Sequence, residues 1–524
     1  MIYVVGSSFN SLAAANAFVN KELDVTILDV GKKSTFQNKQ IIKDLLKRND
    51  IYKVIKFING ITRKNTKNYP KVKMNKTNFG SHFYREKLTN DVVEQQLETE
   101  TSLSYALGGF SNIWGAACLP ILKEEMKNWP INYEDLSKHF DEVSKLLNIN
   151  GENDDLNNFF NFKNYQAYEH GLSSQSKGLL EQLNLKREDL KKSGIYFGRS
   201  KLAINNSNNG YKGCVECGLC FHGCPHDLIF NTIDLFNDFI KNKKINYIPN
   251  IKVKSFDELN NEVTIYAENL EINKMVEFKG KYLFLGSGSI STMKILMDTL
   301  KIKKNITLAS KDQYVAPIYL KFKSELDYKQ NYNTLSEIFI EVNDNEICEN
   351  NVHIQIYPFS DIVLSFLPFF KKFFSKYFNF IFRRLMIAQI LIPSKFSPLI
   401  NVTLSEKNSL ILKSQKNKTS SKIIKNVIKK INQKKSLGFR ILNNLMIKLS
   451  IGGSQHLGSS FKMNRDPKIF ETDIYGRPFG FKNVHVIDAT VLPNLPTATI
   501  VFASMSNSLR IAKKVIKKIL DNQN

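Results

Sequence analysis

The sequence lacks several features that would assign the protein to a simple class. No run of eighteen uncharged apolar residues occurs in its 524 residues, so a membrane-spanning helix is not expected. It contains no zinc-finger spacing and no RNA-binding signature, so nucleic acid is not an expected partner. No secretory signal peptide precedes the first apolar segment, and we therefore expect a cytoplasmic protein.

Acidic residues are few relative to basic ones. The chain has 49 Asp and Glu against 74 Lys and Arg, which gives a formal charge of +25. An anionic membrane surface or a phosphorylated substrate would complement this charge, and a position on the inner face of the membrane is one expectation. The length and the 42% hydrophobic content are enough for two sizeable cores.

The first thirty residues predict a βαβ unit. The segment IYVV turns at Gly6, helical spacing follows, and a second strand, VTIL, ends at Asp29. Such a unit binds a dinucleotide when the glycine permits the tight turn, the helix N-terminus meets the pyrophosphate and the carboxylate accepts ribose hydroxyls. The fingerprint GSSFNS is degenerate, because Ser8 and Ser11 stand where glycine is usual. A parallel βαβ core without a ligand is the alternative.

The C-terminal block, from Gly452 to Lys514, has a second pattern of this kind. It places His456 in GGSQHLGSSFKM, and a strand ending at Asp488 then leads through a Pro-containing loop into the final helix. Unpaired N–H groups at such a helix start can hold a negatively charged cofactor. A histidine held nearby can move protons at that cofactor.

Taken together, the chain resembles the glucose–methanol–choline (GMC) oxidoreductases, flavoproteins that oxidise alcohols with FAD. Four blocks carry the resemblance in the family's order: VVGSSFNSLAAANAF with ILDVG, LGGFSNIWGAACLP, YLFLGSGSISTMKIL and the C-terminal block. The resemblance implies an α/β fold with a Rossmann-like FAD-binding domain and a second, mainly antiparallel-sheet substrate domain. The region from about 306 to 450 resembles nothing in the family, as expected of a variable substrate domain.

The resemblance also implies which segments contact FAD. The first turn would approach the pyrophosphate with an aspartate on the adenosine ribose, a small-residue loop would pass along the flavin, and the start of the last loop would close over the pyrophosphate and ribityl chain. The implied contacts are Gly6, Ser7, Ser8 and Asp29, then Gly108, Gly109, Ser111 and Asn112, and finally Asp488 and Ala489.

His456 is the implied base. In the family the matching histidine lies near flavin N5 and takes the alcohol proton as hydride leaves the carbon. The implied activity is a dehydrogenase of a small alcohol, such as a sugar, polyol or sugar-linked metabolite. One departure is Leu495, which stands where the family has a second His or Asn; Asn494 is adjacent and would point elsewhere.

A cysteine run lies between these blocks. Cys214, Cys217, Cys220 and Cys224 follow the spacing C-x2-C-x2-C-x3-C-P, which is typical of an iron–sulfur cluster. A structural zinc site and a metal-free loop are the alternatives. Because some sugar dehydrogenases of the family hold a cluster close to the flavin, the resemblance implies electron transfer through it to an unidentified acceptor.

The motifs and the resemblance divide the chain into two domains. VHIQIYP and the hairpin NVTLSEKNSLILK predict the antiparallel sheet of the substrate domain. Residues 367–393 carry aromatics at helical spacing with interleaved Lys and Arg, which predicts a basic amphipathic helix that lies on lipid or packs on its own domain. The expected FAD-binding domain is 1–150, 200–305 and 451–524, with the cysteine-rich segment 213–226; the expected substrate domain is 151–199 and 306–450.

Two other functions use the same residues. A non-oxidising flavoenzyme, an isomerase or epimerase in glycan biosynthesis, would keep FAD and change the chemistry. A binding protein would have lost FAD through the degenerate GSSFNS turn.

Overall fold

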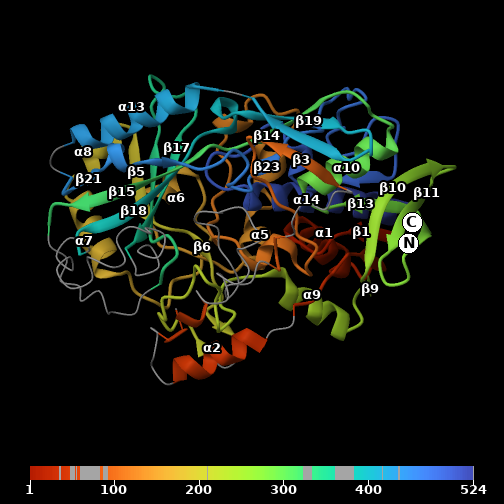
Figure 1. Ribbon diagram of the computed structural model, residues 1–524, viewed down its shortest axis with the longest axis horizontal. Helices are drawn as coiled ribbons and strands as arrows, with labels where there is room; N and C mark the ends of the chain where they lie inside the picture. The colour runs from red at the N-terminus through yellow and green to blue at the C-terminus, as the bar shows by residue number, and fades with distance from the viewer. Residues whose placement is uncertain are drawn as a thin grey trace.

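The fold was obtained from a computed structural model of the chain (Figure 1). The residues it describes are 1–34, 37–47, 53–54, 56–58, 83–85, 92–208, 211–322, 333–359, 383–415, 417–434 and 437–522.

A five-stranded parallel sheet joins segments from both ends of the chain. Its order is β24-β13-β1-β2-β9, and β1 pairs with β13 and with β2 along its whole length. Strands of such a sheet are apolar because helices cover them, and every residue of β1, β2, β13 and β24 is buried. The strands are β1 (Ile2–Val5), β2 (Val25–Leu28), β9 (Asn246–Ile248), β13 (Tyr282–Leu285) and β24 (Val484–Val486).

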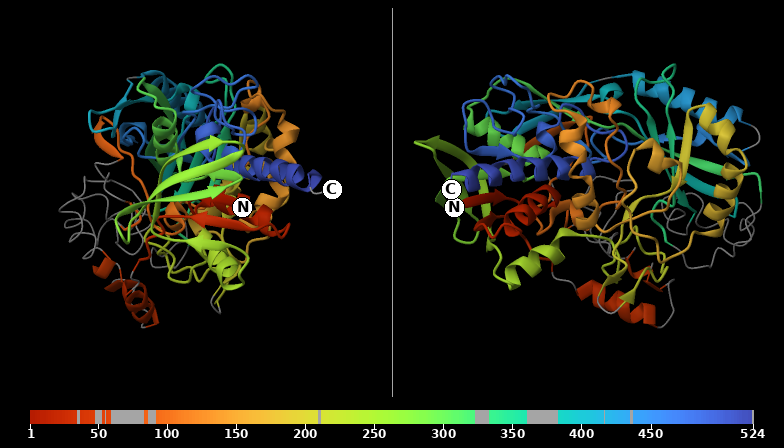
Figure 2. Two further views of the ribbon diagram at one scale, coloured as in Figure 1. Left: turned by 90° about the vertical axis from the view of Figure 1, so that its right-hand side faces the viewer. Right: turned by 180° about the vertical axis from the view of Figure 1, so that it is seen from behind.

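Helices that follow these strands begin at one edge of the sheet. α1 (Phe9–Val19) follows β1, α10 (Ser289–Thr299) follows β13, and α14 (Val501–Asp521) follows β24 after a loop. α1 and α14 pack against each other, and both chain termini lie at this end of the molecule (Figures 1 and 2). The predicted βαβ unit is confirmed.

Two further sheets pack around this part. An antiparallel sheet contains β10 (Ile251–Leu259), β11 (Glu262–Asn269) and β12 (Lys274–Gly280). A five-stranded sheet has the order β23-β14-β19-β20-β3, with β23 (Leu457–Gly458), β14 (Ile306–Ser310), β19 (Leu399–Leu404), β20 (Leu410–Ser414) and β3 (Val93–Leu97). The predicted hairpin NVTLSEKNSLILK is confirmed as β19 and β20.

A seven-stranded antiparallel sheet forms the other end of the molecule (Figure 1). Its path is β21-β15-β18-β17-β16-β5, with β22 paired to β15. The segment VHIQIYP is its strand β17, as predicted. The strands are β5 (Ile195–Arg199), β15 (Gln313–Leu320), β16 (Ile338–Val342), β17 (Val352–Pro358), β18 (Leu385–Leu391), β21 (Phe439–Ile441) and β22 (Ile447–Lys448).

One face of this sheet builds a separate hydrophobic core. Alternate residues such as Ile354, Ile356 and Ile390 pack with three helices, α7 (Ser174–Asn184), α8 (Arg187–Lys192) and α13 (Thr419–Gln433). A parallel sheet with helices and a second, antiparallel sheet is the predicted fold class, which is confirmed.

The two cores show where the antiparallel strands belong. The core of the parallel sheet includes residues of β14, β19 and β20, such as Leu308 and Val402, whereas β15 to β18 contribute to the second core. The hairpin therefore packs with the parallel sheet, although its sequence position lies within the expected substrate domain. The domain boundaries remain a prediction.

The predicted amphipathic helix is wrong over its C-terminal part. Residues 385–391 form strand β18, because their backbone pairs with β15 on one side and with β17 on the other. Most of their apolar side chains are buried in this arrangement. Residues 367–382 of the prediction lie outside the described residues. Among the described helices, none has the length and apolar character needed to cross a membrane.

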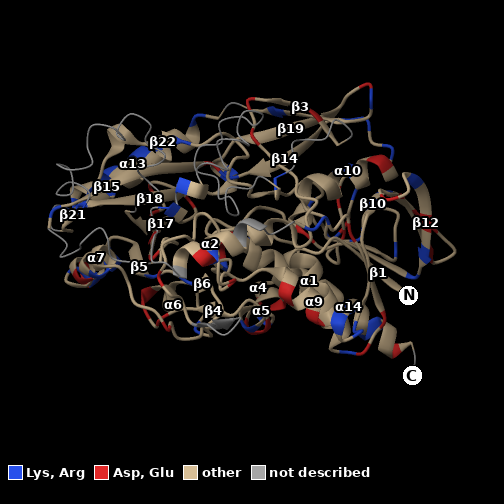
Figure 3. Cartoon of the chain, turned by 60° about the horizontal axis from the view of Figure 1, so that its bottom comes forward, with Lys and Arg blue, Asp and Glu red and all other residues tan. Residues whose placement is uncertain are grey.

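The remaining elements are short. Five helices are α2 (Gln37–Lys47), α4 (Tyr133–Ser137), α5 (Phe140–Leu146), α6 (Asp155–Phe159) and α9 (Thr232–Lys241). Two small ladders pair β4 (Ile149–Asn150) with β6 (Leu202–Ala203) and β7 (Ser207–Asn208) with β8 (Tyr211–Lys212). Lys and Arg are spread over many of the elements together with Asp and Glu (Figure 3).

Candidate functional site

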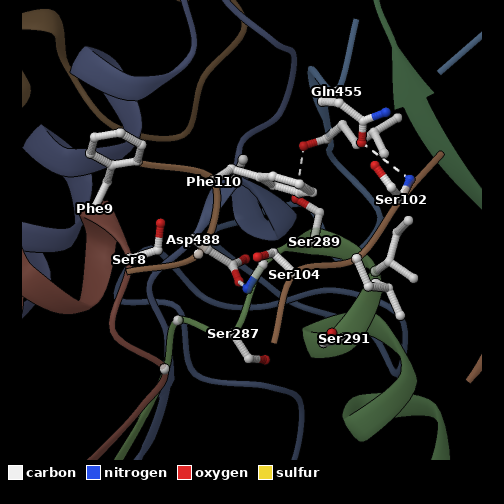
Figure 4. Close-up of a pocket in the computed structure, with 18 of the residues that line it drawn as sticks. Ser8, Phe9, Ser102, Ser104, Phe110, Ser287, Ser289, Ser291, Gln455 and Asp488 are labelled. Carbon is white, nitrogen blue, oxygen red and sulfur yellow. Dashed lines mark hydrogen bonds between the residues drawn. The ribbon is translucent and has the colours of Figure 1, made fainter. Parts of the chain in front are cut away.

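A cavity of about 790 Å³ lies between the parallel sheet and the seven-stranded sheet. Its walls come from segments that are far apart in sequence: the turn after β1, the turn after β13, the loop before β23, the start of α14, and one face of β15, β17 and β18. Serine side chains from several of these segments, with Asp488, surround one part of it (Figure 4).

Three helices begin at this cavity. The lining includes Phe9 at the start of α1, Ser289 at the start of α10 and Val501 at the start of α14. None of the three helices has a side-chain cap or an acidic residue in its first turn. The first N–H groups of a helix lack intrahelical partners and carry partial positive charge, so these three starts favour an anionic ligand. The start of α10 already holds one carboxylate, that of Asp488, which accepts from the N–H of Gly288 at 3.0 Å.

The turn after β1 requires glycine at its first position. Gly6 has φ +91°, and a Cβ there would lie 3.0 Å from the carbonyl oxygen of Gly286. Ser11 stands at the position of the third glycine of the G-x-G-x-x-G motif. Its hydroxyl is accommodated there because Oγ lies within hydrogen-bond distance of the carbonyl oxygens of Val5 and Gly286 and can donate to either one. A Cβ on Gly286 would lie 2.4 Å from that hydroxyl, so this glycine makes room for the serine.

The predicted ribose-binding carboxylate lines the cavity. Asp29 accepts hydrogen bonds from Ser7 Oγ and, at 3.1 Å, from the Tyr247 hydroxyl. Burial raises the pKa of Asp29 to about 6, although the two hydroxyl donors oppose this shift. Ser7 Oγ also accepts from the N–H of Gly108, which ties the first turn to the small-residue loop.

That loop reaches the cavity only in part. Gly109 lines it, whereas Gly108, Ser111 and Asn112 do not. Ser111 Oγ instead donates to the carbonyl of Gly108 and accepts from the N–H of Thr232, and Asn112 Nδ2 donates to the carbonyl of Gly109. These side chains hold the shape of the loop; their contact with a cofactor stays a prediction.

Asp488 and Ala489 also line the cavity. Asp488 accepts from the N–H groups of Thr490 and Gly288, both at 3.0 Å, and from the Thr292 hydroxyl at 2.6 Å. The carboxylate thereby links the last loop to the start of α10. Burial raises the pKa of Asp488.

His456 faces the same cavity from the loop before β23. Its Nδ1 atom is buried and has no hydrogen-bond partner in the described part of the chain. Burial lowers the pKa of His456 well below its usual value, and the charge of Lys311 acts in the same direction. The imidazole is therefore neutral at neutral pH.

Lys311 is a site residue that the sequence did not indicate. Its ammonium group donates to the carbonyl oxygens of Pro496, Thr497 and Ala498 at 2.8, 2.6 and 3.1 Å. Burial lowers the pKa of Lys311 to about 7. Glu125 accepts from the N–H and the hydroxyl of Thr497. The buried side chains of Lys311 and Glu125 therefore both hold residues 496–498, the loop before α14.

Leu495 and Asn494 do not line the cavity. The Leu495 backbone N–H donates to Ser394 Oγ at 3.0 Å, and its side chain is buried. Asn494 Oδ1 accepts from the Trp129 indole, so this amide points elsewhere, as the sequence predicted.

The structure does not support the predicted metal centre at the cysteine run. Among the described residues, no group of three or more His, Cys, Asp and Glu side chains is placed to hold a metal ion. Burial, with the charge of Cys220 as a second cause, raises the pKa of Cys217 to about 12 and that of Cys214 as well. The iron–sulfur prediction is therefore not supported by the placement of the described side chains.

The segment instead packs against the seven-stranded sheet. The Phe221 ring lies 5.6 Å from the Tyr357 ring between centroids, and it lines the cavity. Cys220 Sγ donates to Asn333 Oδ1 at 3.3 Å, and Thr334 Oγ1 donates to the Gly218 carbonyl at 3.2 Å.

Comparison with known proteins gives a structural likeness alone. No family model matches the sequence. No curated protein matches it either. Among solved structures, the chain is similar to pyridoxine 4-oxidase from Mesorbium loti, with a TM-score of 0.57 and 11% identity over 98% of this chain and 99% of that one. At this identity the likeness shows that the two proteins share a fold.

Proposed function

We propose that the protein is an FAD-dependent oxidoreductase that acts on CH–OH groups. The observation that carries this proposal is the convergence on one cavity of three uncapped helix starts, the Asp29 carboxylate and a neutral His456. The fold shared with a protein named as an oxidase of pyridoxine, an alcohol, supports it.

The residues present fit FAD. Gly6 allows the positive φ of the first turn and its close packing on Gly286, and the N–H groups beside Ser7 and Ser8 suit a pyrophosphate. The carboxylate of Asp29 would accept the adenosine ribose hydroxyls, and Asp488 with Ala489 would close the other side. When bound, FAD would supply the acceptor for the hydride that leaves the alcohol carbon.

His456 would take the alcohol proton. Loss of hydride from carbon leaves a carbonyl only if the oxygen loses its proton, and a neutral imidazole is the suitable base. Burial and the nearby Lys311 disfavour a positive charge on His456, so the imidazole is unprotonated before the alcohol reacts. Because Leu495 offers no polar atom to the substrate oxygen, His456 would carry this task without the family's second polar side chain.

The test is anaerobic mixing of the purified protein with alcohols, including pyridoxine. Bleaching of the flavin absorbance with one carbonyl product per flavin supports the proposal. A flavoprotein that converts a sugar without net oxidation would establish the isomerase or epimerase, and a colourless protein that takes up no added FAD would establish the binding protein. Reoxidation by dioxygen or by a separate carrier identifies the electron acceptor.

A further inference from the structure

One face of the seven-stranded sheet is polar where it borders the cavity. Strand register places Gln389 directly beside Gln355, and Gln313 lies in the adjacent row, opposite Leu391. Because side chains on a strand alternate between faces, Gln355 and Tyr357 point away from the core that Ile354 and Ile356 build. All four polar residues line the cavity: Gln313, Gln355, Tyr357 and Gln389.

A buried pair behind this face fixes its hydrogen-bond pattern. His353 Nδ1 lies against the Glu341 carboxylate, and both side chains are fully buried. The amide nitrogen of Gln355 approaches His353 Nε2 at 3.0 Å. Because that nitrogen is a donor, the imidazole must accept through Nε2 and donate to Glu341 through Nδ1. The Gln355 carbonyl is consequently turned toward Tyr357.

The pattern leaves polar groups available to a ligand. The Tyr357 hydroxyl has one proton but lies 2.7 Å from the Gln355 carbonyl oxygen and 2.8 Å from that of Gln389. It can satisfy only one of them at a time. The amide nitrogens of Gln313 and Gln389 have no hydrogen-bond partner in the described part of the chain. An acceptor and several donors thus face the cavity together.

No charge accompanies these groups. Strands β15, β17 and β18 contain no Asp, Glu, Lys or Arg. The nearest buried charges already have partners. Glu341 is held by His353 and Asn351, and Lys311 by three carbonyl oxygens. Asp312, next to Gln313, pairs with Lys448 at 2.7 Å and accepts from the Ser420 hydroxyl. A phosphate or carboxylate at this face would find no cation. The opposite end of the cavity is different, since its lining includes Lys252, Lys254, Lys294 and Lys407, which lie on β10, on α10 or next to α10.

We propose that this amide face recognises the substrate and selects an uncharged, hydroxyl-rich molecule, a neutral sugar or polyol. Neighbouring hydroxyls, each donor and acceptor, match amide groups that present both functions. A phosphorylated sugar would bury its charge unpaired, and an aliphatic alcohol would leave the amides unsatisfied. The inference rests on the proposed function, because the reacting hydroxyl must lie beside His456 on the same cavity.

The test uses the flavin-loaded protein and a panel of compounds. The panel holds neutral hexoses and pentoses, linear and cyclic polyols, the hexose phosphates, pyridoxine, hexanol and benzyl alcohol, and the measured quantity is kcat/KM for anaerobic flavin reduction. We expect a neutral polyhydroxy compound to exceed its own phosphate and both simple alcohols by at least about tenfold. A phosphorylated or simple alcohol as the best substrate, or neutral members that are all inert, would overturn the inference.

The outcomes separate this inference from the proposed function. If only hexanol or pyridoxine reduces the flavin, the proposed oxidoreductase activity is supported and the inference that the amide face selects a neutral sugar is contradicted. A protein that binds no FAD, or FAD that no alcohol reduces, removes the proposed function and the inference with it.

A variant pair locates the effect on the sheet. Gln389→Leu removes the carbonyl oxygen and the NH2 group of the side-chain amide at similar volume. We expect KM for the best polyol to rise about tenfold with a smaller change in kcat. Gln433→Leu, at the exposed end of α13, is the matched control and should leave KM unchanged. Should Gln389→Leu fail to fold, Gln313→Leu provides the same test. An unchanged KM in a folded variant would contradict the inference.

Discussion

The two ends of the cavity present different chemical groups. At the parallel sheet the available groups are backbone N–H donors at the starts of α1, α10 and α14. At the seven-stranded sheet they are side-chain amides and one phenol. The first end has Lys252, Lys254, Lys294 and Lys407 in its lining, whereas the three strands of the second have no charged residue.

This difference explains why a degenerate motif can persist at one end. Backbone donors remain when a side chain changes, provided that the turn keeps its shape. Ser11 is accommodated because Gly286 makes room for it, and Ser8 has an ordinary φ of −88° as the N-cap of α1. Side-chain recognition has no such tolerance, since each amide is itself the recognising group. We therefore expect substitutions at the cofactor end to act mainly through space and conformation.

The largest effect should come from substitution of His456, which lines the same cavity. His456→Ala removes the base, and we expect flavin reduction to slow by about 10²- to 10⁴-fold, as is usual for loss of general base catalysis. Stopped-flow absorbance under anaerobic conditions measures the rate. The flavin content of the variant is the control and should be unchanged. A variant as fast as the parent protein would remove His456 from the mechanism.

Gly6→Val tests the conformational requirement at the cofactor end. At φ +91° a valine is strained and its Cβ meets the Gly286 carbonyl, so we expect FAD affinity to fall by about 3 kcal/mol, roughly a hundredfold. Equilibrium titration of the apoprotein measures it. Ser8→Gly is the matched control: Ser8 needs no positive φ, so its affinity should stay within a few-fold of the parent. Equal losses in both variants would contradict the account.

Asp29 should give a smaller and pH-dependent effect. The pKa of Asp29 in the folded protein is about 6, above the ordinary value of 3.8, so the carboxylate forms as pH rises through 6 and FAD affinity should rise with it. The stability of the apoprotein should change with pH in the opposite direction. Asp29 binds its proton more tightly in the folded apoprotein than in the unfolded chain, so its contribution to the free energy of unfolding declines between about pH 4 and 6. Asp29→Asn should weaken FAD binding by about 1 kcal/mol and remove the pH dependence. A titration series from pH 5 to 8 would show either result.

Cys217→Ser should have the smallest effect. The thiol is protonated at neutral pH and belongs to no metal-binding group among the described residues. We expect the free energy of unfolding to change by less than about 1 kcal/mol and the absorbance spectrum to stay the same. Iron and sulfide in the anaerobically purified parent that are absent from the variant would restore the iron–sulfur prediction.

The sequence predicted best where chemistry depends on local spacing. The IYVV–Gly6–VTIL pattern and the β19–β20 hairpin follow from turns and periodicity within a few residues, and both are present. The aromatic segment shows the limit. Its spacing favoured a helix through residue 393, yet pairing of Leu385–Leu391 with β15 and β17 made it a strand. An apolar run of this length does not reveal its period by itself.

The polar sheet face could have been found in part. Alternation in VHIQIYP already sets His353, Gln355 and Tyr357 on one side, although such a polar side is most often a solvent-facing one. Lys311 gave no sequence pattern at all, because its partners are backbone carbonyl oxygens of residues 496–498.

The sequence alone therefore determined the elements at the cofactor end: a turn that needs Gly6, a strand that ends at Asp29, and a histidine in a Gly/Ser-rich loop. Only the tertiary structure decided that three helix starts share one cavity and that Gln389 lies beside Gln355. The physical reason is range. Turns and helix starts are determined by residues that are close together in the sequence. The neighbours of a side chain on a sheet depend on the register between strands that are far apart in the sequence.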